Sequence, residues 1–445
     1  MIENRVKKKR ILIAVTSALV IGLVAYFMLN DKNDIAINEE VVINEINFPD
    51  EVFREYISAN FDTNGDGILS RKEISEVREI VVSYVSSYKY KEVESLKGIE
   101  HFSSLQVLDC GSTRITNLDV SKNTALEGLN CSYTKLTSLD VSNNPNLKKL
   151  DCSSTKLTSL DVSNCTTLET LECSNTELTS LDVSQNTALE SLHCDKTGII
   201  SLDVSKNTVL ESFGCYNTEL TSLDVSKNTK LTYLNCHNTK LTSLDVSKNT
   251  ALETLRCSST ELTSLDVSQN TALKILDCND TNLTNLDVSK NTELGYLLCY
   301  ETELTSLDVS NNLNLEELSC YNTKLTSLDV SQNAELIILS CEDTPLAWLN
   351  IGNNSSLYLN KDLTSLLLSK DLTSEIYLKE METTFDITEK FPGIDVSKIS
   401  ITSGAVIDSQ GIVSGYKQGV PIVYTYDCST SKNVSLKLQV TLNIS

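Results

Sequence analysis

Histidine and positive charge are both scarce in this chain of 445 residues. The 37 Lys and Arg residues are outnumbered by 60 Asp and Glu, which gives a formal net charge of −23. Phosphate binding needs clustered Lys and Arg, so this balance excludes nucleic acids as partners. The only histidines are His101, His193 and His237, and the sequence has no nucleophile–base pair, phosphate-binding glycine loop or HExxH motif. The sequence therefore predicts that the protein is not an enzyme.

The first 30 residues carry a basic group followed by an uncharged apolar run over residues 11–29. Nineteen helical residues at about 1.5 Å each approach the roughly 30 Å needed to cross a bilayer. The run is longer than a signal-peptide core, and no small-residue cleavage site follows it. We expect a transmembrane signal anchor in the cytoplasmic membrane; the alternative is a cleaved signal peptide and a secreted protein. Because the basic flank stays inside, everything beyond residue 30 is expected to be extracytoplasmic, at the cell surface.

Residues 31–46 are expected to form a linker, and residues 47–80 have the pattern of an EF-hand-like helix–loop–helix cap. Apolar residues recur at helical spacing in 47–61, and the loop DTNGDGILSRKE follows at 62–73. Calcium takes six to eight hard oxygen ligands, and Gly67 allows the sharp turn at the sixth loop position. The predicted ligands are Asp62, Asn64, Asp66, the carbonyl group of Ile68, Ser70 and Glu73. We expect one structural calcium ion here; the alternative is an acidic turn.

A 21-residue unit organises the next part of the chain, and LTSLDVSKNTALETLRCSSTE at residues 241–261 is a typical copy. It recurs in strict register eleven times over residues 115–345, after an imperfect first coil at 96–114. Such exact self-similarity is typical of a solenoid, so residues 81–355 are predicted to be a repeat solenoid. The atypical first coil is expected because the end of a solenoid must cover an open apolar face.

Each unit contains two half-patterns, LxxLDVSxN and LxxLxCxxT. Their alternation places two side chains inward and one outward, so we expect two short strands per coil and two parallel sheets. The Asn that ends the first half should bond backbone groups of adjacent coils, and the Thr that ends the second half should do the same. Cys165 replaces this Asn once and should leave a gap. The Asn column is Asn123, Asn144, Asn186, Asn207, Asn228, Asn249, Asn270, Asn291, Asn312 and Asn333.

Twelve of the 14 cysteines occupy a single column of the repeat. Cys packs as a small hydrophobe, so we expect the stacked thiols to lie in the core. A disulfide ladder fits poorly, since parallel side chains hold their Cβ atoms about 4.8 Å apart rather than about 3.8 Å. A zinc site fits poorly because ligands in a line do not converge. The column is Cys110, Cys131, Cys152, Cys173, Cys194, Cys215, Cys236, Cys257, Cys278, Cys299, Cys320 and Cys341.

An Asp column faces outward in the LDVS half, where like charges would stack about 4.8 Å apart. We expect each carboxylate to bond the Ser hydroxyl or backbone amides of the neighbouring coil; a calcium-lined stripe is the alternative. The column is Asp119, Asp140, Asp161, Asp182, Asp203, Asp224, Asp245, Asp266, Asp287, Asp308 and Asp329.

The two half-patterns differ in how much they vary along the chain. LTSLDVSxN scarcely changes, whereas the outward positions around LxxLxC change from unit to unit. Repeat proteins place recognition residues on such a variable surface, and Tyr offers a large, rigid contact area with a polar tip. We predict a partner-binding patch here; the alternative is a set of scattered exposed tyrosines. Its members are Tyr216, Tyr233, His237, Tyr296, Tyr300 and Tyr321.

Two further segments follow the repeats. Residues 356–383 are predicted to close the solenoid as a C-terminal cap of strand and helix. Residues 384–445 are rich in Val, Ile and Thr, and their alternating runs are broken at Gly, Ser and Asn, which is typical of a small β-sandwich. The lone Cys428 has no partner for a bridge within this domain.

The segment LxxLxCxxTxL is similar to the LxxLxLxxNxL segment of leucine-rich repeat proteins, with Cys in a Leu position and Thr in the Asn position. With its membrane-targeting start and helical cap, the chain resembles bacterial cell-surface leucine-rich repeat proteins of the internalin type, in which an immunoglobulin-like domain follows the repeats. Its unit has 21 residues, whereas internalins usually have 22. The resemblance implies adhesion through a protein or glycan ligand; a passive structural spacer of the cell envelope is the alternative.

Overall fold

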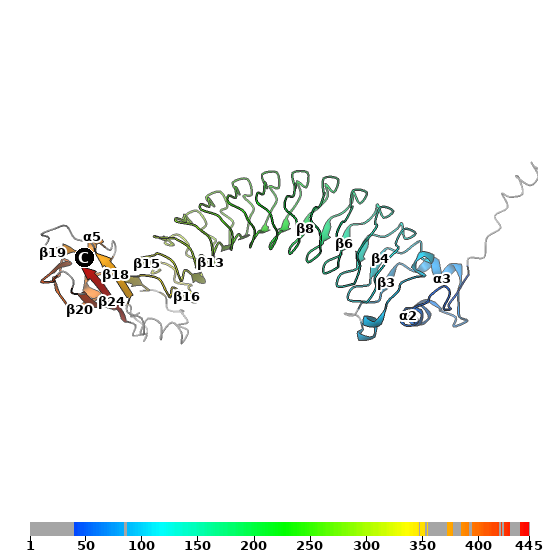
Figure 1. Cartoon of the computed structure of the whole chain (residues 1–445), viewed down its shortest axis with the longest axis horizontal. Coiled ribbons are helices and arrows are strands. Elements are labelled where there is room, and N and C mark those ends of the chain that lie inside the picture. Colours follow the sequence, from blue (N-terminus) through cyan, green and yellow to red (C-terminus); the bar gives the residue numbers. More distant parts are fainter. Residues whose placement is uncertain are drawn as a thin grey trace, which may run out of the picture.

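The computed structural model describes residues 40–83, 87–346, 348–351, 354, 372–376, 384–390, 394–417, 420, 422–427 and 437–444. They form a curved solenoid with a helical unit at one end and small sheets at the other (Figure 1). The apolar run at 11–29 lies outside the described residues, as does the linker up to residue 39. Within the described part of the chain, no helix has the length and apolar character needed to span a membrane.

The N-terminal unit consists of β1 (Val41–Val42), α2 (Glu51–Phe61), β2 (Ile68–Leu69) and α3 (Arg71–Glu76). Asp50 caps α2, because its carboxylate accepts a 2.9 Å hydrogen bond from the N–H of Phe53. The second carboxylate oxygen accepts a 2.7 Å bond from the N–H of Glu94, which ties the unit to the first coil. Buried apolar side chains of the unit and the solenoid form one continuous core. The unit therefore packs against the first coil as part of the same core.

The strand β1 falls within the segment expected to be a linker. It pairs antiparallel with β2 in the EF-hand-like loop, with Val41 opposite Leu69 and Val42 opposite Ile68. The sequence contains no second EF-hand-like loop, so β1 serves as the pairing partner of the strand in this loop. The helix expected to reach residue 80 ends at Glu76 instead, because Val77 adopts an extended conformation and the β-branched residues after it continue as a strand.

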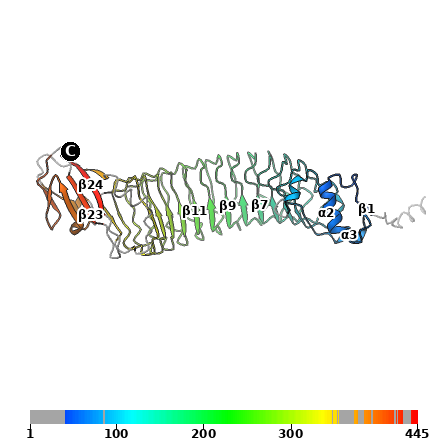
Figure 2. The same cartoon turned by 90° about the horizontal axis from the view of Figure 1, so that it is seen from below.

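The solenoid contains one long parallel sheet of thirteen strands (Figure 2). Strands β4 to β14, and then β16, pair residue for residue with the strand 21 residues away, without a register shift. Two short 3-10 helices, η1 (Tyr88–Glu92) and η2 (Ile99–His101), precede the second strand. The strands are β3 (Glu79–Val81), β4 (Val107–Asp109), β5 (Gly128–Asn130), β6 (Lys149–Asp151), β7 (Thr170–Glu172), β8 (Ser191–His193), β9 (Ser212–Gly214), β10 (Tyr233–Asn235), β11 (Thr254–Arg256), β12 (Ile275–Asp277), β13 (Tyr296–Leu298), β14 (Glu317–Ser319) and β16 (Ile338–Ser340).

The prediction of a second parallel sheet is wrong for most of the solenoid. In the LDVS half, only β15 (Ser327–Asp329) and β17 (Trp348–Asn350) pair as strands among the described residues. The coils curve around the long sheet, so they are spread further apart on the opposite side (Figure 1). Backbone groups there lose their inter-coil partners, and side chains take over part of the bonding.

The Asn column carries that side-chain bonding, as expected. Asn228 is fully buried, and its Nδ2 donates to the carbonyl oxygens of Val204 and Asn207 in the preceding coil, both at 2.9 Å. The same pair of bonds recurs along the column and extends to Asn354. Cys165 occupies its position in the ladder with weaker contacts, since its Sγ lies 3.7 Å from each of the two carbonyl oxygens.

The Thr column does not mirror the Asn column, which corrects the expectation for the second bend. The Thr239 hydroxyl donates to the carbonyl oxygen of Cys236 in its own coil, at 2.8 Å. A hydroxyl three residues beyond a carbonyl reaches back to it without crossing to another coil. The bond closes the turn locally, so the Thr column does not form an inter-coil ladder; Thr344 alone in this column donates to the preceding coil, to the Cys320 carbonyl at 3.3 Å.

A left-handed residue follows the Cys in every coil, two positions later. Glycine would be the usual residue at such φ values, yet this column contains none. From Ser112 to Asn322, the backbone N–H of each of these residues bonds the next coil, as Glu301 does with the Tyr321 carbonyl at 3.0 Å. The column is Ser112, Tyr133, Ser154, Asn175, Lys196, Asn217, Asn238, Ser259, Asp280, Glu301, Asn322 and Asp343, with φ between 49° and 60°.

The C-terminal region contains two small sheets. One has the order β18-β24-β23-β20 and the other β19-β22-β21. β18 lies in the segment expected to be the cap, yet it pairs in parallel with β24, so this sheet draws on residues before 384. The lone Cys428 lies outside the described residues. The elements are β18 (Leu372–Ile376), β19 (Thr384–Asp386), α5 (Ile387–Lys390), η3 (Val396–Lys398), β20 (Ile399–Ser403), β21 (Val406–Ile407), β22 (Ile412–Ser414), β23 (Ile422–Asp427) and β24 (Lys437–Ile444).

Candidate binding surface

The outward side of the long sheet forms the candidate binding surface, here called the sheet face. Each strand buries its middle residue and turns its first and third residues outward, and the residue after the Cys lies beside them. The sheet lies on the inner side of the arc (Figure 1), so the three rows of outward side chains run along that side. These rows belong to the variable half of the unit. All six residues of the predicted patch lie on them.

Tyr216, Tyr233 and His237 gather with His193 into a first aromatic cluster on β8 to β10 and the turns after them. The ring centroids of Tyr216 and His237 are 5.6 Å apart, and those of His193 and Tyr233 are 6.2 Å apart. The Lys196 ammonium group lies 5.7 Å from the centroid of the Tyr216 ring, within cation–π range. All of these rings are half-buried, so they form a supported platform.

Tyr300 and Tyr321, in the turns after β13 and β14, form a second aromatic cluster, and Tyr296 lies at the start of β13 on the same face. The rings of Tyr300 and Tyr321 stack with centroids 4.3 Å apart and 10° between their planes. Tyr296 is 40% exposed and donates its hydroxyl to the Glu316 carboxylate at 2.9 Å. Burial, with the neighbouring Tyr300 and Glu301, raises the pKa of Tyr321 to about 12, so this ring stays uncharged at neutral pH.

The two clusters are separated by β11 and β12, so the predicted patch is two clusters rather than one continuous surface. Arg256 on β11 is exposed, and Asp277 on β12 is half-buried. Burial raises the pKa of Asp277, although bonds from Asn279 and Ser258 and the charge of Arg256 oppose the rise. The Asn279 side chain donates to Asp277 Oδ1 at 2.6 Å. A polar strip with a partly desolvated carboxylate therefore lies between the aromatic clusters.

His193 is held in place by polar neighbours on three coils. Its Nδ1 lies 3.5 Å from Asp195 Oδ2, and its Nε2 lies 3.1 Å from the Ser212 hydroxyl. Burial lowers the pKa of His193, but the bond to Asp195 and the charges of Glu172 and Asp195 outweigh it, and the pKa is raised. Gly214 leaves room for this pair, because a Cβ there would lie 2.4 Å from Nδ1. Sequence reasoning missed this cluster, although a lone Gly in a row of larger residues was a signal.

The alignment of Ser212, His193 and Asp195 resembles a nucleophile–base–acid chain. Acyl transfer also needs N–H donors for the developing oxyanion. The N–H of Ser212 bonds the Glu190 carbonyl at 3.0 Å, and that of Cys215 bonds the Asn235 carbonyl at 2.9 Å. These donors are already used in the sheet. The arrangement orients the imidazole ring and gives no support to catalysis.

The EF-hand-like loop is closed by its own hydrogen bonds. Asp62 accepts bonds from the N–H groups of Gly65, Asp66 and Gly67 at 2.8, 3.2 and 2.9 Å. The Asn64 side chain donates to Asp66 Oδ2 at 2.8 Å. The structure thus brings together the first three predicted ligands, and Ile68 follows directly in β2.

Glu73 is buried, and both its carboxylate oxygens are occupied. One accepts bonds from the N–H and hydroxyl of Thr63 at 2.7 and 2.5 Å, and the other from the N–H and hydroxyl of Ser70, both at 2.8 Å. The Thr63 hydroxyl, followed by the Ser70 groups, lowers the pKa of Glu73 to about 2. In the described ranges no three His, Cys, Asp or Glu side chains are grouped so that they could hold a metal ion. Bidentate calcium binding by Glu73 would require these four bonds to be exchanged.

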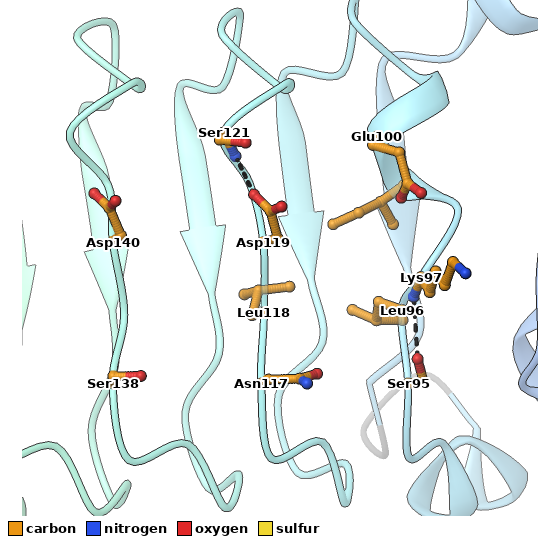
Figure 3. Close-up of a pocket in the computed structure, with 11 residues that line it drawn as sticks. Ser95, Leu96, Lys97, Glu100, Asn117, Leu118, Asp119, Ser121, Ser138 and Asp140 are labelled. Carbon is orange, nitrogen blue, oxygen red and sulfur yellow. Dashed lines mark hydrogen bonds between the residues drawn. The ribbon is translucent and has the colours of Figure 1, made fainter.

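The Asp column bonds within each coil, which corrects the expected bond to the neighbouring coil. Asp119 Oδ1 accepts a 2.9 Å bond from the N–H of Ser121, and Asp140 occupies the same place in the next coil (Figure 3). A Ser two residues after an Asp presents its backbone N–H to the carboxylate. The carboxylate therefore bonds this nearby N–H in its own coil and not a group in the neighbouring coil. Bonds from Ser121 lower the pKa of Asp119, and the Ser two residues later lowers the pKa of each column member from Asp140 to Asp308 in the same way.

A hollow lies on this constant side, where the first coils meet the N-terminal unit (Figure 3). Leu96, Ile99 and Leu118 are its only apolar lining residues, and the rest are Ser, Asn, Lys, Asp and Glu. Ligand sites are usually lined mainly by apolar and aromatic side chains. The sheet face is therefore the better candidate for binding.

The Cys column lies in the core. All thirteen cysteines in the described part of the chain are buried and free of disulfides. Cys110 Sγ donates to the Asn130 carbonyl of the next coil at 3.3 Å. Burial raises the pKa of Cys236 and Cys299 to about 12, so these thiols stay protonated and unreactive.

The repeat and the sheet define a leucine-rich repeat protein. A family model described as leucine-rich repeat matches residues 237–253 and 321–334. No curated protein sequence matches the chain.

Solved structures place the chain near the internalins. The functional domain of InlJ from Listeria monocytogenes, which includes a cysteine ladder, matches with a TM-score of 0.65 and 29% identity over 92% of this chain and 99% of that one. The internalin inlF from Listeria monocytogenes matches with a TM-score of 0.64 and 20% identity, over 73% of this chain and 98% of that one. A leucine-rich repeat protein of Leptospira interrogans matches with a TM-score of 0.53 and 22% identity, over 64% of this chain and 84% of that one. At these identities, the last two matches show the fold alone. The chain is a leucine-rich repeat protein with structural similarity to Listeria internalins.

Proposed function

We propose that this protein is a non-catalytic cell-surface binding protein that uses its sheet face for adhesion to a protein or glycan. The observation that carries the proposal is the pair of aromatic clusters on the variable half of the unit. Supported aromatic rings with polar tips supply contact area at a low cost in conformational entropy. The similarity to the functional domain of InlJ supports a binding role and a surface location.

Residues 11–29 are proposed to anchor the chain in the cytoplasmic membrane, with the solenoid outside. The support is the length of the uncharged run and its basic flank. Cell fractionation tests this: the full chain should remain in the membrane pellet after a high-salt wash. Recovery of a shortened chain in the medium would instead indicate cleavage.

A calcium ion is proposed to order the N-terminal unit. The oxygens of Asp62, Asn64 and Asp66 lie together and are of the kind that calcium prefers, and Ser70 and Glu73 close the loop. Adding calcium to chelator-treated protein should raise the melting temperature, by the equivalent of about 1.4 kcal/mol at ten times Kd. Glu73→Gln should abolish the increase. An unchanged melting temperature in the original chain at millimolar calcium would refute the proposal.

The competing function is that of a passive spacer in the cell envelope. Protein and glycan arrays probed with the full chain distinguish the two, because a spacer should bind nothing. Alanine at Tyr233, Tyr296 and Tyr300 should remove binding to any ligand found. Tyr133→Ala is the matched control, since Tyr133 is 68% exposed and lies outside both clusters. Equal binding by the triple variant and the original chain would exclude the sheet face as the binding surface.

A further inference from the structure

We infer that the sheet face between β7 and β14 binds a basic, extended polypeptide segment of another protein, with its arginines seated beside the two aromatic clusters. The inference rests on the proposed binding function and specifies the partner. Three observations support it: the charge of the face, two half-buried carboxylates, and the placement of the rings.

Negative charge dominates the three outward rows from β4 to β16. These rows carry two basic side chains, Lys149 and Arg256, and seven acidic ones. A face of this sign favours a cationic partner and repels polyanionic glycans. The acidic residues are Asp109, Asp151, Glu172, Asp195, Asp277, Glu317 and Glu342.

Glu172 and Asp277 are half-buried carboxylates with incomplete compensation. Burial raises the pKa of Glu172, and within the described residues its carboxylate accepts no hydrogen bond and forms no ion pair. Burial also raises the pKa of Asp277, against the weaker opposing effects of its neighbours. A partly desolvated carboxylate gains more from an incoming cation than an exposed one does, because screening is weaker there. A neutral sugar would supply no such charge.

The aromatic clusters suit arginine in particular. A guanidinium group can stack on a Tyr ring while its N–H groups bond a carboxylate, which an ammonium group does less well. Asp277 lies close enough to Tyr300 to influence its pKa, and Glu172 does the same for His193 in the first cluster. Each cluster therefore pairs rings with a half-buried carboxylate.

The spacing of the two carboxylates sets the form of the partner. The two carboxylates that would receive the arginines, Glu172 on β7 and Asp277 on β12, are five steps of about 4.8 Å apart, or roughly 24 Å in total. An extended chain covers that length in about seven residues, at roughly 3.3 Å each. The partner segment should therefore run across the strands with basic residues about seven positions apart.

The test uses the full chain and three probes: a Gly–Ser peptide with Arg at every seventh position, the same peptide with Glu in those places, and dextran. Fluorescence anisotropy should show that the Arg peptide binds and that the Glu peptide and dextran do not. Combined Glu172→Gln and Asp277→Asn substitutions should weaken it at least tenfold. The control, Asp182→Asn with Asp266→Asn, makes the same change in charge on the opposite side of the coils and should weaken binding by no more than about twofold.

Three results would overturn the inference. Equal weakening by the face variant and the control would show only a response to net charge. Absence of Arg-peptide binding would remove the basic partner. Dextran binding that is lost in Tyr300→Ala would assign the face to a neutral glycan and leave the proposed binding function standing, whereas a chain that binds no array ligand refutes that function as well.

Discussion

The two halves of each coil solve different problems with the same backbone period. The LDVSxN half holds coils together at a position where they are spread too far apart for a sheet, and it does so with a buried Asn that makes the same two bonds each time. The LxxLxCxxT half already has its strands paired by backbone bonds, so its outward side chains are free to change. The half of the unit whose sequence stays constant along the chain is therefore the half in which side chains supply the bonds between coils.

The largest expected effect is in the constant half, for Asn228→Ala. The substitution removes two buried hydrogen bonds between coils and leaves the Val204 and Asn207 carbonyl oxygens with only the backbone N–H donors of their own coil, so the free energy of unfolding should fall by about 1–3 kcal/mol. Urea unfolding followed by circular dichroism measures it. The exposed neighbour Lys227→Ala is the control and should change stability by less than about 0.5 kcal/mol. Equal losses in both variants would mean that the ladder contributes little.

The opposite change, Cys165→Asn, should repair the natural gap in the ladder. Two amide hydrogen bonds would replace sulfur contacts of 3.7 Å, which should raise the free energy of unfolding by about 1–2 kcal/mol. The same urea experiment applies, with Cys173→Asn in the other half as control, where a buried amide should destabilise the chain. A loss of stability in Cys165→Asn would show that this coil has adjusted to the smaller side chain.

A smaller increase in stability is expected in the variable half, from a substitution in the column of left-handed residues. Glu301 adopts a φ of 54°, and Asn tolerates this region better than Glu does. Glu301→Asn should therefore raise the free energy of unfolding by about 0.5–1 kcal/mol. The reverse substitution Asn322→Glu, in the next coil at a φ of 51°, should lower it by a similar amount. Two changes of the same sign would exclude backbone conformation as the cause.

The smallest effect is a pH dependence centred on His193. Its pKa in the folded chain is raised above the ordinary 6.5, so its charged form stabilises the fold below about pH 6.5, and this contribution disappears as the pH rises through the folded pKa. His193→Gln should lower the melting temperature at pH 5.5 and change it little at pH 9, with a difference below about 1 kcal/mol. Asp195→Asn should reduce the same dependence. A pH-independent difference between the original chain and His193→Gln would contradict this account.

The 21-residue period and its alternation were sufficient to predict the solenoid, the buried Leu and Cys columns and the inward Asn. These features depend on spacing alone. The second sheet was predicted wrongly because alternation shows which way a side chain points, but not whether the next coil is near enough for backbone bonding. The left-handed column was missed because residues such as Glu301, Lys196 and Tyr133 carry no sign of an unusual φ.

The sequence predicted that the six patch residues face outward from the long sheet, as they do, but could not show how they group. Grouping depends on which rows are occupied in neighbouring coils and on rotamers, as in the stacking of Tyr300 on Tyr321. The link between His193 and Asp195 crosses two rows and depends on the space left by Gly214 in the next coil. The candidate calcium ligands were chosen from spacing alone, whereas the four bonds to Glu73 follow from the folded loop.

Every Asn of the ladder donates toward the N-terminal end and receives nothing from that side, so each coil presents the same acceptors to its successor. One whole unit can therefore be removed or duplicated at the level of the gene while every junction that remains keeps its contacts. A change of 21 codons alters the separation of the two ends by about 4.8 Å along the sheet and costs no new interface. The length of the protein is thus open to stepwise change by recombination, independently of what its surface binds.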